Sequence, residues 1–275
     1  MTNTVKRTLS GIIFLAVVIG GLLIDKYLYA ALLTFMMVTL LYEFFRMTMG
    51  ELFPRTRALA IVLGCCAFLS LFFVMAFRLD IRLVGISAIL LLVLMVSTLM
   101  VKDKADFKLF AFVYTGLVYI AVPLTLSNFV VFDQAGQFDG RPMLAFLIII
   151  WASDVGAYCV GMLLGKYSKK LFPSVSPKKT WAGFWGGLAF SILAGLILVW
   201  TGLWTYPWYH AIILSVIMHV AGVFGDLFES QWKRVCEVKD SGDIIPGHGG
   251  MLDRFDSALF AIPAGVIYLV IIGLL

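Results

Sequence analysis

Charged residues are scarce in this sequence. Asp, Glu, Lys and Arg together make up 13% of its 275 residues, whereas hydrophobic residues make up 62% and the mean hydropathy is +1.01. Soluble domains usually carry about 25% charged residues, because these side chains cover the surface that faces water. The composition therefore excludes an ordinary soluble protein.

Cysteine is also rare, and the positions of the four cysteines exclude two kinds of site. Cys65, Cys66 and Cys159 fall in apolar runs, and Cys236 falls in a loop. None has the C-x-x-C spacing of a zinc site, and none has a partner for an extracellular disulfide, so we interpret them as small apolar side chains. The sequence also lacks a separate basic or aromatic module of the kind that binds nucleic acid, and no nucleic-acid partner is expected.

Long apolar runs, by contrast, recur along the whole chain. An α-helix needs roughly 20 residues to cross a hydrocarbon core about 30 Å thick. Nine runs come close to this length, near residues 9–24, 27–43, 58–77, 83–101, 109–132, 143–164, 183–204, 209–228 and 257–275. The predicted fold is an all-α, polytopic integral membrane protein with about nine transmembrane helices.

The basic residues predict the orientation of these helices, because Lys and Arg accumulate on the cytoplasmic side of a membrane. With a cytoplasmic N-terminus, 17 of the 21 basic residues fall in cytoplasmic segments and four fall outside. We therefore predict a cytoplasmic N-terminus. An anionic lipid or nucleotide would be favoured on this face.

Polar chemistry is concentrated in the second half of the chain. Residues 1–140 are predicted to form N-terminal transmembrane helices with few internal polar side chains. Residues 141–275 are interrupted by charged and glycine-rich segments, and we expect them to form a catalytic transmembrane region with cytoplasmic loops.

The first polar feature is Asp154, in the stretch WASDVGAYCVG. A carboxylate within the membrane costs about 2.5–3.5 kcal/mol on insertion scales, so it should face the bundle interior, a cavity or a cation. The small residues Gly156, Ala157 and Gly161 would let another helix approach closely. Asp154 could instead serve packing specificity alone.

The second feature is the lysine-rich segment GKYSKKLFPSVSPKKTWAGFWGG. Its first three lysines are explained by the positive-inside bias. The SPKKTW portion differs, because Lys178, Lys179 and Thr180 stand at a predicted helix start, where free backbone N–H groups suit phosphate. We predict a phosphate contact there.

The third and richest feature extends over residues 219–257. Asp226 is expected at the cytoplasmic end of the eighth span, and Asp253 and Asp256 at the start of the ninth, so that carboxylates from two helix ends form an all-oxygen site for Mg²⁺. Acids at a helix start are also stabilised by the helix dipole alone. Positive charge and close backbone approach to an anion are supplied by a set of basic residues and glycines: Lys233, Arg234, Lys239, Gly249 and Gly250.

Two histidines belong to this third feature. His248 could hydrogen-bond a phosphate, act as an acid or cap the glycine turn. His219 lies on an apolar helix face, and we interpret it as a structural hydrogen-bonding group. Carboxylates, basic residues and a glycine turn at one membrane face are the combination that phosphoryl or nucleotidyl transfer requires.

These residues resemble the signature of the phosphatidate cytidylyltransferases, also called CDP-diglyceride synthases. The resemblance is carried by SQWKRVCEVKDSGDIIPGHGGMLDRFD, residues 230–256, and is supported by GDLFES, SPKKTW and the W-x-x-D-x-x-A-Y that includes Asp154. Trp232 stands where the family usually has an aliphatic residue or Phe. Ala182 stands where many members have Glu or Gln, so a role for that side chain is in doubt.

The resemblance implies a Mg²⁺-dependent reaction of CTP with phosphatidic acid that yields CDP-diacylglycerol and pyrophosphate. We assign Asp226 and Asp253 as metal ligands, with Asp256 a third candidate, and expect Asp240 and Asp154 to orient cations or water. Phosphate contacts are assigned to a basic set: Lys178, Lys179, Lys233, Arg234, Lys239 and Arg254. A bacterial inner membrane, a site facing the cytoplasm and a homodimer are compatible with this assignment.

Two other functions remain open from the residues themselves. A transporter or channel would also place an acid within the membrane, but it should show polar residues along a continuous path. A CTP-using lipid kinase, such as a polyprenol or phytol kinase, would need a general base for its alcohol, and Asp240 or His248 could serve. The length of the signature disfavours the kinase.

Overall fold

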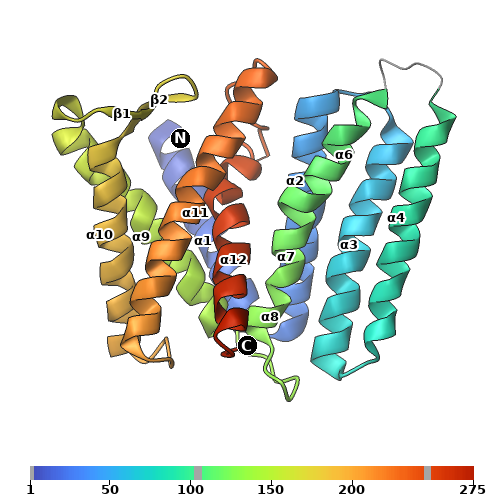
Figure 1. Ribbon diagram of the computed structural model, residues 1–275, viewed down its shortest axis with the longest axis horizontal. Coiled ribbons are helices and arrows are strands. Elements are labelled where there is room, and N and C mark those ends of the chain that lie inside the picture. Colours follow the sequence, from blue (N-terminus) through green and yellow to red (C-terminus); the bar gives the residue numbers. More distant parts are fainter. Residues whose placement is uncertain (1–2, 102–106, 245–248) are drawn as a thin grey trace. The chain divides into compact units, whose positions relative to one another are not determined.

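The computed structural model describes residues 3–101, 107–244 and 249–275 of the chain, and these residues are mostly helical (Figure 1). The all-α prediction is confirmed. Turns of 3-10 or π type are marked η, and the elements in chain order are α1 (Asn3–Leu23), α2 (Lys26–Met49), α3 (Pro54–Phe77), η1 (Ile81–Val84), α4 (Gly85–Ser97), η2 (Thr98–Met100), α6 (Phe110–Gly116), η3 (Leu117–Ala121), α7 (Val122–Leu126), α8 (Asn128–Val131), α9 (Arg141–Leu164), η4 (Gly165–Tyr167), β1 (Lys170–Phe172), β2 (Ser176–Thr180), α10 (Trp181–Trp200), α11 (Trp208–Val235) and α12 (Leu252–Ile271).

Within the described residues, seven helical segments are long and apolar enough to cross a membrane. They are Lys26–Met49, Pro54–Phe77, Phe110–Val131, Arg141–Tyr167, Trp181–Trp200, Trp208–Val235 and Leu252–Ile271. The other two predicted spans form the shorter apolar helices Gly11–Leu23 and Ile81–Ser97. The prediction of a polytopic membrane protein is confirmed, and these two shorter helices lie where the remaining predicted spans were expected.

The chain divides into two compact units. Unit 1 comprises residues 1–139 and 236–254, and unit 2 comprises residues 140–235 and 255–275. In unit 1, α2 packs against α1, α3 and α6, and α3 packs against α4 and α7. Its core contains the fully buried aromatic side chains of Tyr29, Phe44 and Phe68. The predicted separation into N-terminal helices (residues 1–140) and a catalytic region (residues 141–275) concerns function and stays a prediction.

Unit 2 is built on close contacts between small residues of α9 and α10. A Cβ atom added to Gly156 would lie 2.7 Å from the carbonyl oxygen of Gly186, and one added to Gly183 would lie 3.0 Å from that of Ala157. Backbones can approach this closely only where side chains are absent or small. The prediction that Gly156 and Ala157 admit a neighbouring helix is confirmed.

The last two helices of unit 2 also meet at a glycine. A Cβ atom on Gly225 of α11 would lie 2.5 Å from the carbonyl oxygen of Asp256 in α12. The helix α11 continues to Val235, whereas the apolar run that predicted it ends near residue 228. Asp226 therefore lies more than two helical turns before the end of α11, and its expected position at the helix end is wrong.

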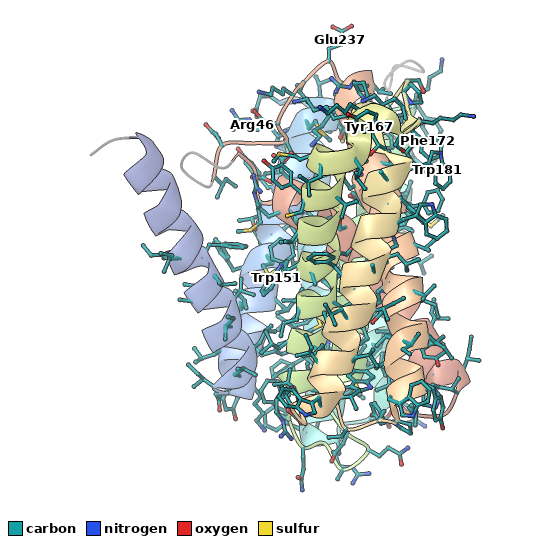
Figure 2. The ribbon with its side chains drawn as sticks, turned by 90° about the vertical axis from the view of Figure 1, so that its left-hand side faces the viewer. Arg46, Trp151, Tyr167, Phe172, Trp181 and Glu237 are labelled. Atoms are coloured by element: carbon teal, nitrogen blue, oxygen red, sulfur yellow. The ribbon has the colours of Figure 1, made fainter. Side chains whose placement is uncertain are left out.

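A short antiparallel hairpin connects α9 to α10. Lys170 pairs with Thr180 and Phe172 pairs with Ser176, with an irregular register between the two pairs. Figure 2 shows Tyr167, Phe172 and Trp181 near this end of unit 2, with Trp151 further along α9. Tyr167, Phe172 and Trp181, in and beside the hairpin, are all exposed, as expected for side chains at a membrane interface.

Candidate functional site

The hairpin strand β2 sends its two adjacent lysines in different directions. Side chains alternate between the two faces of a strand. Lys178 is exposed, whereas Lys179 is half-buried and its Nζ lies 2.6 Å from Oδ2 of Asp226 on α11. The SPKKTW and GDLFES segments, which are distant in the sequence, therefore meet through this ion pair.

Three further carboxylates of unit 2 belong to the same group of charges. Asp256 on α12 interacts electrostatically with Asp226, Glu229 and Asp154, and Asp154 also interacts with Lys179. Asp154 is exposed, and its expected role in orienting a cation or water stays a prediction. The Ser230 hydroxyl donates to Asp226 Oδ1 at 3.3 Å. The arrangement concentrates negative charge beside a lysine from the hairpin.

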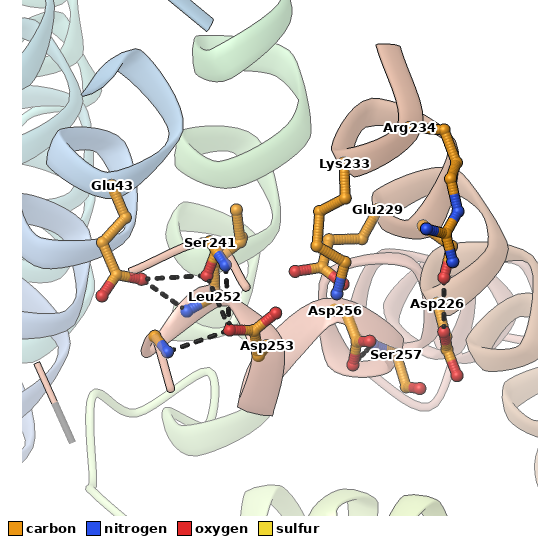
Figure 3. Close-up of polar contacts among 12 residues, drawn as sticks. Glu43, Asp226, Glu229, Lys233, Arg234, Ser241, Leu252, Asp253, Asp256 and Ser257 are labelled. Carbon is orange, nitrogen blue, oxygen red and sulfur yellow. Dashed lines mark hydrogen bonds and ion pairs between the residues drawn. The ribbon is translucent and has the colours of Figure 1, made fainter. Parts of the chain in front are cut away.

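Two basic residues near the end of α11 already contact protein groups. Lys233 Nζ lies 2.5 Å from Oε2 of Glu229, whose side chain is fully buried (Figure 3). A buried carboxylate needs such a partner, because removing it from water is costly. Arg234 Nε donates to the carbonyl oxygen of Val175 in the hairpin, at 3.4 Å. The phosphate contacts assigned to Lys233 and Arg234 stay predictions.

The first backbone amides of α10 were expected to be free for a phosphate. The backbone N–H of Trp181 donates to the Lys169 carbonyl at 3.0 Å, that of Ala182 donates to Ser168 Oγ at 2.9 Å, and that of Gly183 donates to Thr180 Oγ1 at 3.2 Å. Thr180 is thus the N-cap of the helix. The expectation that these amides are free is wrong, because all three are hydrogen-bonded within the protein, whereas a phosphate contact of the Lys178, Lys179 or Thr180 side chains stays a prediction.

The part of the signature between α11 and α12, residues 236–251, is called the signature loop here, and in unit 1 its described residues Ser241 and Gly250 bind Asp253. Its Oδ2 accepts hydrogen bonds from the backbone N–H of Ser241 at 3.1 Å, the hydroxyl of Ser241 at 3.0 Å and the backbone N–H of Gly250 at 2.9 Å. Gly249 has a positive φ of 85°, a conformation that glycine adopts readily. Most of the predicted glycine turn lies outside the described residues, and Asp253 joins Ser241 to Gly250 on its two sides.

A second acid of unit 1, Glu43, binds the same loop. Its Oε1 accepts from the N–H of Met251 at 3.0 Å, and its Oε2 accepts from the N–H of Leu252 at 2.8 Å (Figure 3). The Ser241 hydroxyl lies 3.5 Å from Oε2. Glu43 is buried within the apolar helix α2.

The structure shows the exposure or the contacts of most of the remaining residues that were predicted to belong to the site. Lys239, Asp240 and Arg254 are exposed, whereas His248 lies outside the described residues. The Oγ of Ser153 lies 2.7 Å from Nδ1 of the buried His219, which confirms a structural hydrogen bond there.

Sequence reasoning missed Glu43 and Glu229. Glu43 interrupts the apolar run TLLYEFFRM, and the cost of an acid within the membrane would have singled it out as it did Asp154. Glu229 stands in the GDLFES stretch, four residues before Lys233, at the spacing of a helical ion pair. Both signals were present in the sequence.

The donor set of unit 2 fits a hard cation such as Mg²⁺, because it consists of carboxylate oxygens. Among the described residues, however, no three His, Cys, Asp or Glu side chains stand as a ready metal site. Mg²⁺ usually binds through one or two carboxylates together with water and substrate phosphates. The acids of unit 2 suit such an open site.

Comparison with known proteins identifies related sequences along almost the whole chain. The Cytidylyltransferase family matches residues 5–272. A phosphatidate cytidylyltransferase from Bacillus subtilis (strain 168) is 32% identical over 263 residues, which cover 96% of each chain. Proteins of the same name are 38% identical over 66% of this chain and 67% of the relative in Staphylococcus epidermidis, and 36% identical over 62% and 63% in Staphylococcus haemolyticus.

Proposed function

Because the chain belongs to the cytidylyltransferase family, we infer that it is an enzyme of phospholipid biosynthesis that converts CTP and phosphatidate to CDP-diacylglycerol and pyrophosphate. The observation that carries this function is the meeting of three signature segments in unit 2. Lys179 from the hairpin pairs with Asp226 of α11, and Asp226 interacts with Asp256 of α12. Positive and negative groups that suit phosphates and a cation are thereby gathered in one place.

The reaction needs no protein nucleophile. An anionic phosphate oxygen of phosphatidate attacks the α-phosphorus of CTP, the bond from this phosphorus to the bridging oxygen of the β-phosphate breaks, and pyrophosphate leaves with the electron pair. The protein therefore contributes alignment of the two phosphates and stabilisation of the charge that spreads over them. Basic residues of the hairpin are suited to this task.

Among these basic residues, we propose that Lys179 is the principal phosphate ligand of unit 2. Its ammonium is half-buried beside Asp226, so the carboxylate holds it in place before the substrate arrives. A preorganised cation stabilises transition-state charge more effectively than a mobile one. Lys178, which is exposed on the other strand face, is expected to contribute less.

We propose that Mg²⁺ is required and that Asp226 and Asp256 of unit 2 hold it, while the metal-ligand assignment of Asp253 in unit 1 stays a prediction of the sequence. A bound Mg²⁺ would neutralise phosphate oxygens and so supply electrostatic activation. Support comes from the excess of acids over lysines around Asp256, since like charges gathered together are stabilised by a cation.

We propose that the membrane is the bacterial inner membrane and that the signature loop faces the cytoplasm, where CTP is available. The charge bias and the bacterial relatives support this orientation. A variant that keeps only Cys236, with the other three cysteines replaced by Ala, should react with a membrane-impermeant maleimide in permeabilised cells and not in intact cells. Burial raises the pKa of the Cys236 thiol, so labelling is best done above neutral pH, where more thiolate is present. Reaction in intact cells would refute the orientation.

Label transfer tests the reaction itself. Purified protein in detergent receives Mg²⁺ and phosphatidate, with CTP labelled in parallel at the α- or the γ-phosphate. Lipid should acquire label from the α position alone, together with released pyrophosphate. Label from the γ position would indicate a lipid kinase, and label from neither would contradict both enzymes. The homodimer compatible with the sequence is tested separately, by light scattering of the same detergent sample.

A further inference from the structure

The carboxylate of Glu43 is bound by a segment about 200 residues further along the chain. Glu43 is 2% exposed, and it accepts hydrogen bonds from the backbone N–H groups of Met251 and Leu252. These amides lie at the start of α12, where the first N–H groups of a helix have no partner within the helix. Glu43 therefore caps α12 from another helix, and its negative charge is favoured by the helix dipole.

Two glycines of the loop leave room for this carboxylate. A Cβ atom on Gly242 would lie 2.6 Å from Glu43 Oε1, and one on Gly250 would lie 2.8 Å from Oε2. Real Cβ atoms essentially never come this close to another heavy atom. The loop backbone is thus fitted around Glu43 on both sides.

Ser241 links Glu43 to Asp253, the acid of the signature that was predicted to be a metal ligand. Its hydroxyl lies 3.5 Å from Glu43 Oε2 and donates to Asp253 Oδ2 at 3.0 Å, and its backbone N–H also donates to Asp253. Figure 3 shows Ser241 placed between the two carboxylates. A shift of the Glu43 carboxylate would therefore move the partners that orient Asp253.

We propose that Glu43 is a positioning residue for cytidylyl transfer. It fixes the backbone at Ser241, Gly242 and residues 250–252, where α12 starts, and through these residues it orients Asp253, while it contacts no substrate itself. This proposal rests on the proposed function, because it assigns Glu43 a part in that reaction. The charge-assisted hydrogen bonds from two helix amides make it a stronger clamp than a neutral side chain would be.

The substitution Glu43→Gln tests the positioning role of Glu43, because it removes the carboxylate with little change in side-chain volume. An amide offers one acceptor oxygen where two N–H groups need acceptors, and it turns an NH₂ group toward one of these donors. We expect kcat to fall by about tenfold to a hundredfold, because small misplacements in an active site have effects of this size. The KM for CTP should stay within about threefold, as expected of a group that does not bind substrate.

Glu51→Gln is the matched control. Glu51 lies just beyond α2, its side chain is 83% exposed and its ion pair with Arg57 spans 3.7 Å, so the same change should leave kcat unaltered and change the thermal midpoint little, as expected of an exposed pair. Glu43→Asp keeps both oxygens on a shorter side chain, and its kcat should lie between those of the wild type and Glu43→Gln. A Glu43→Gln enzyme with wild-type kcat would overturn the proposal.

Amide hydrogen exchange gives a readout that does not depend on activity. In unliganded Glu43→Gln, residues 249–252 should exchange faster than in the wild type, while α3 in the same unit should be unchanged. Faster exchange throughout both regions would show a merely structural role and overturn the proposal. If the wild type transfers no label, the proposed function is refuted. If residues 249–252 exchange at the same rate in the wild type and in Glu43→Gln, the positioning role of Glu43 is refuted.

Discussion

The contact between α11 and α12 supplies a sharp test of how the acids of unit 2 are placed. A methyl group at Gly225 would lie 2.5 Å from the Asp256 carbonyl oxygen and 3.1 Å from Phe260 Cβ. Ordinary contact begins near 3.4 Å, so Gly225→Ala should push the two helices apart by about 1 Å. Asp226 follows Gly225 directly, and its position relative to Asp256 would change with this displacement.

Activity should respond to Gly225→Ala more than stability does. Overpacking costs about 1–3 kcal/mol, but alanine in place of glycine in a helix returns about 1 kcal/mol. The net loss of unfolding free energy is therefore about 0–2 kcal/mol, from the difference of these two effects. A displacement of about 1 Å in a catalytic site can lower the rate about a hundredfold. We expect kcat to fall by about tenfold to a hundredfold.

Gly222→Ala is the matched control, because Gly222 faces the same helix one turn earlier. A Cβ atom there would lie 3.5 Å from Ser257 Cβ and 3.7 Å from the Ser257 carbonyl oxygen, which is ordinary contact. This variant should keep kcat within about twofold and match or exceed the wild-type thermal midpoint. Initial rates with α-labelled CTP and thermal unfolding in detergent measure both quantities. Equal behaviour of the two variants would refute the reasoning from helix spacing.

Three further predictions concern the charged groups. Lys179→Met removes the cation beside Asp226 and should lower kcat by about a hundredfold or more. Lys170→Met, on the exposed part of β1, is the control, and its kcat should stay within about threefold of the wild type. Similar losses of label transfer in the two variants would contradict the role of Lys179. Asp226→Asn should abolish turnover while the chromatographic profile and thermal midpoint stay close to wild type, and a variant that retains activity within a few-fold would remove Asp226 from the site. Chelation with EDTA should stop label transfer, and added Mg²⁺ should restore it; undiminished transfer in EDTA would contradict the need for a divalent cation.

Much of the fold and the location of the chemistry were predictable from local sequence. Apolar runs predict helices because a membrane-spanning backbone must satisfy its own hydrogen bonds. The predicted end of the eighth helix was wrong because α11 continues beyond its apolar run to Val235, through the charged residues Lys233 and Arg234. The hairpin of residues 170–180 was not predicted, since its strands are short and carry no alternating apolar pattern.

The sequence by itself determined the membrane class, the helical architecture and the residue types of the candidate site, because hydropathy and composition act locally along the chain. Only the tertiary structure decided that Lys179 rather than Lys178 pairs with Asp226, that protein groups occupy the amides at the start of α10, and that Glu43 caps α12. Each of these outcomes depends on contacts between segments far apart in the sequence. Such contacts are set by helix packing, which the order of residues does not display.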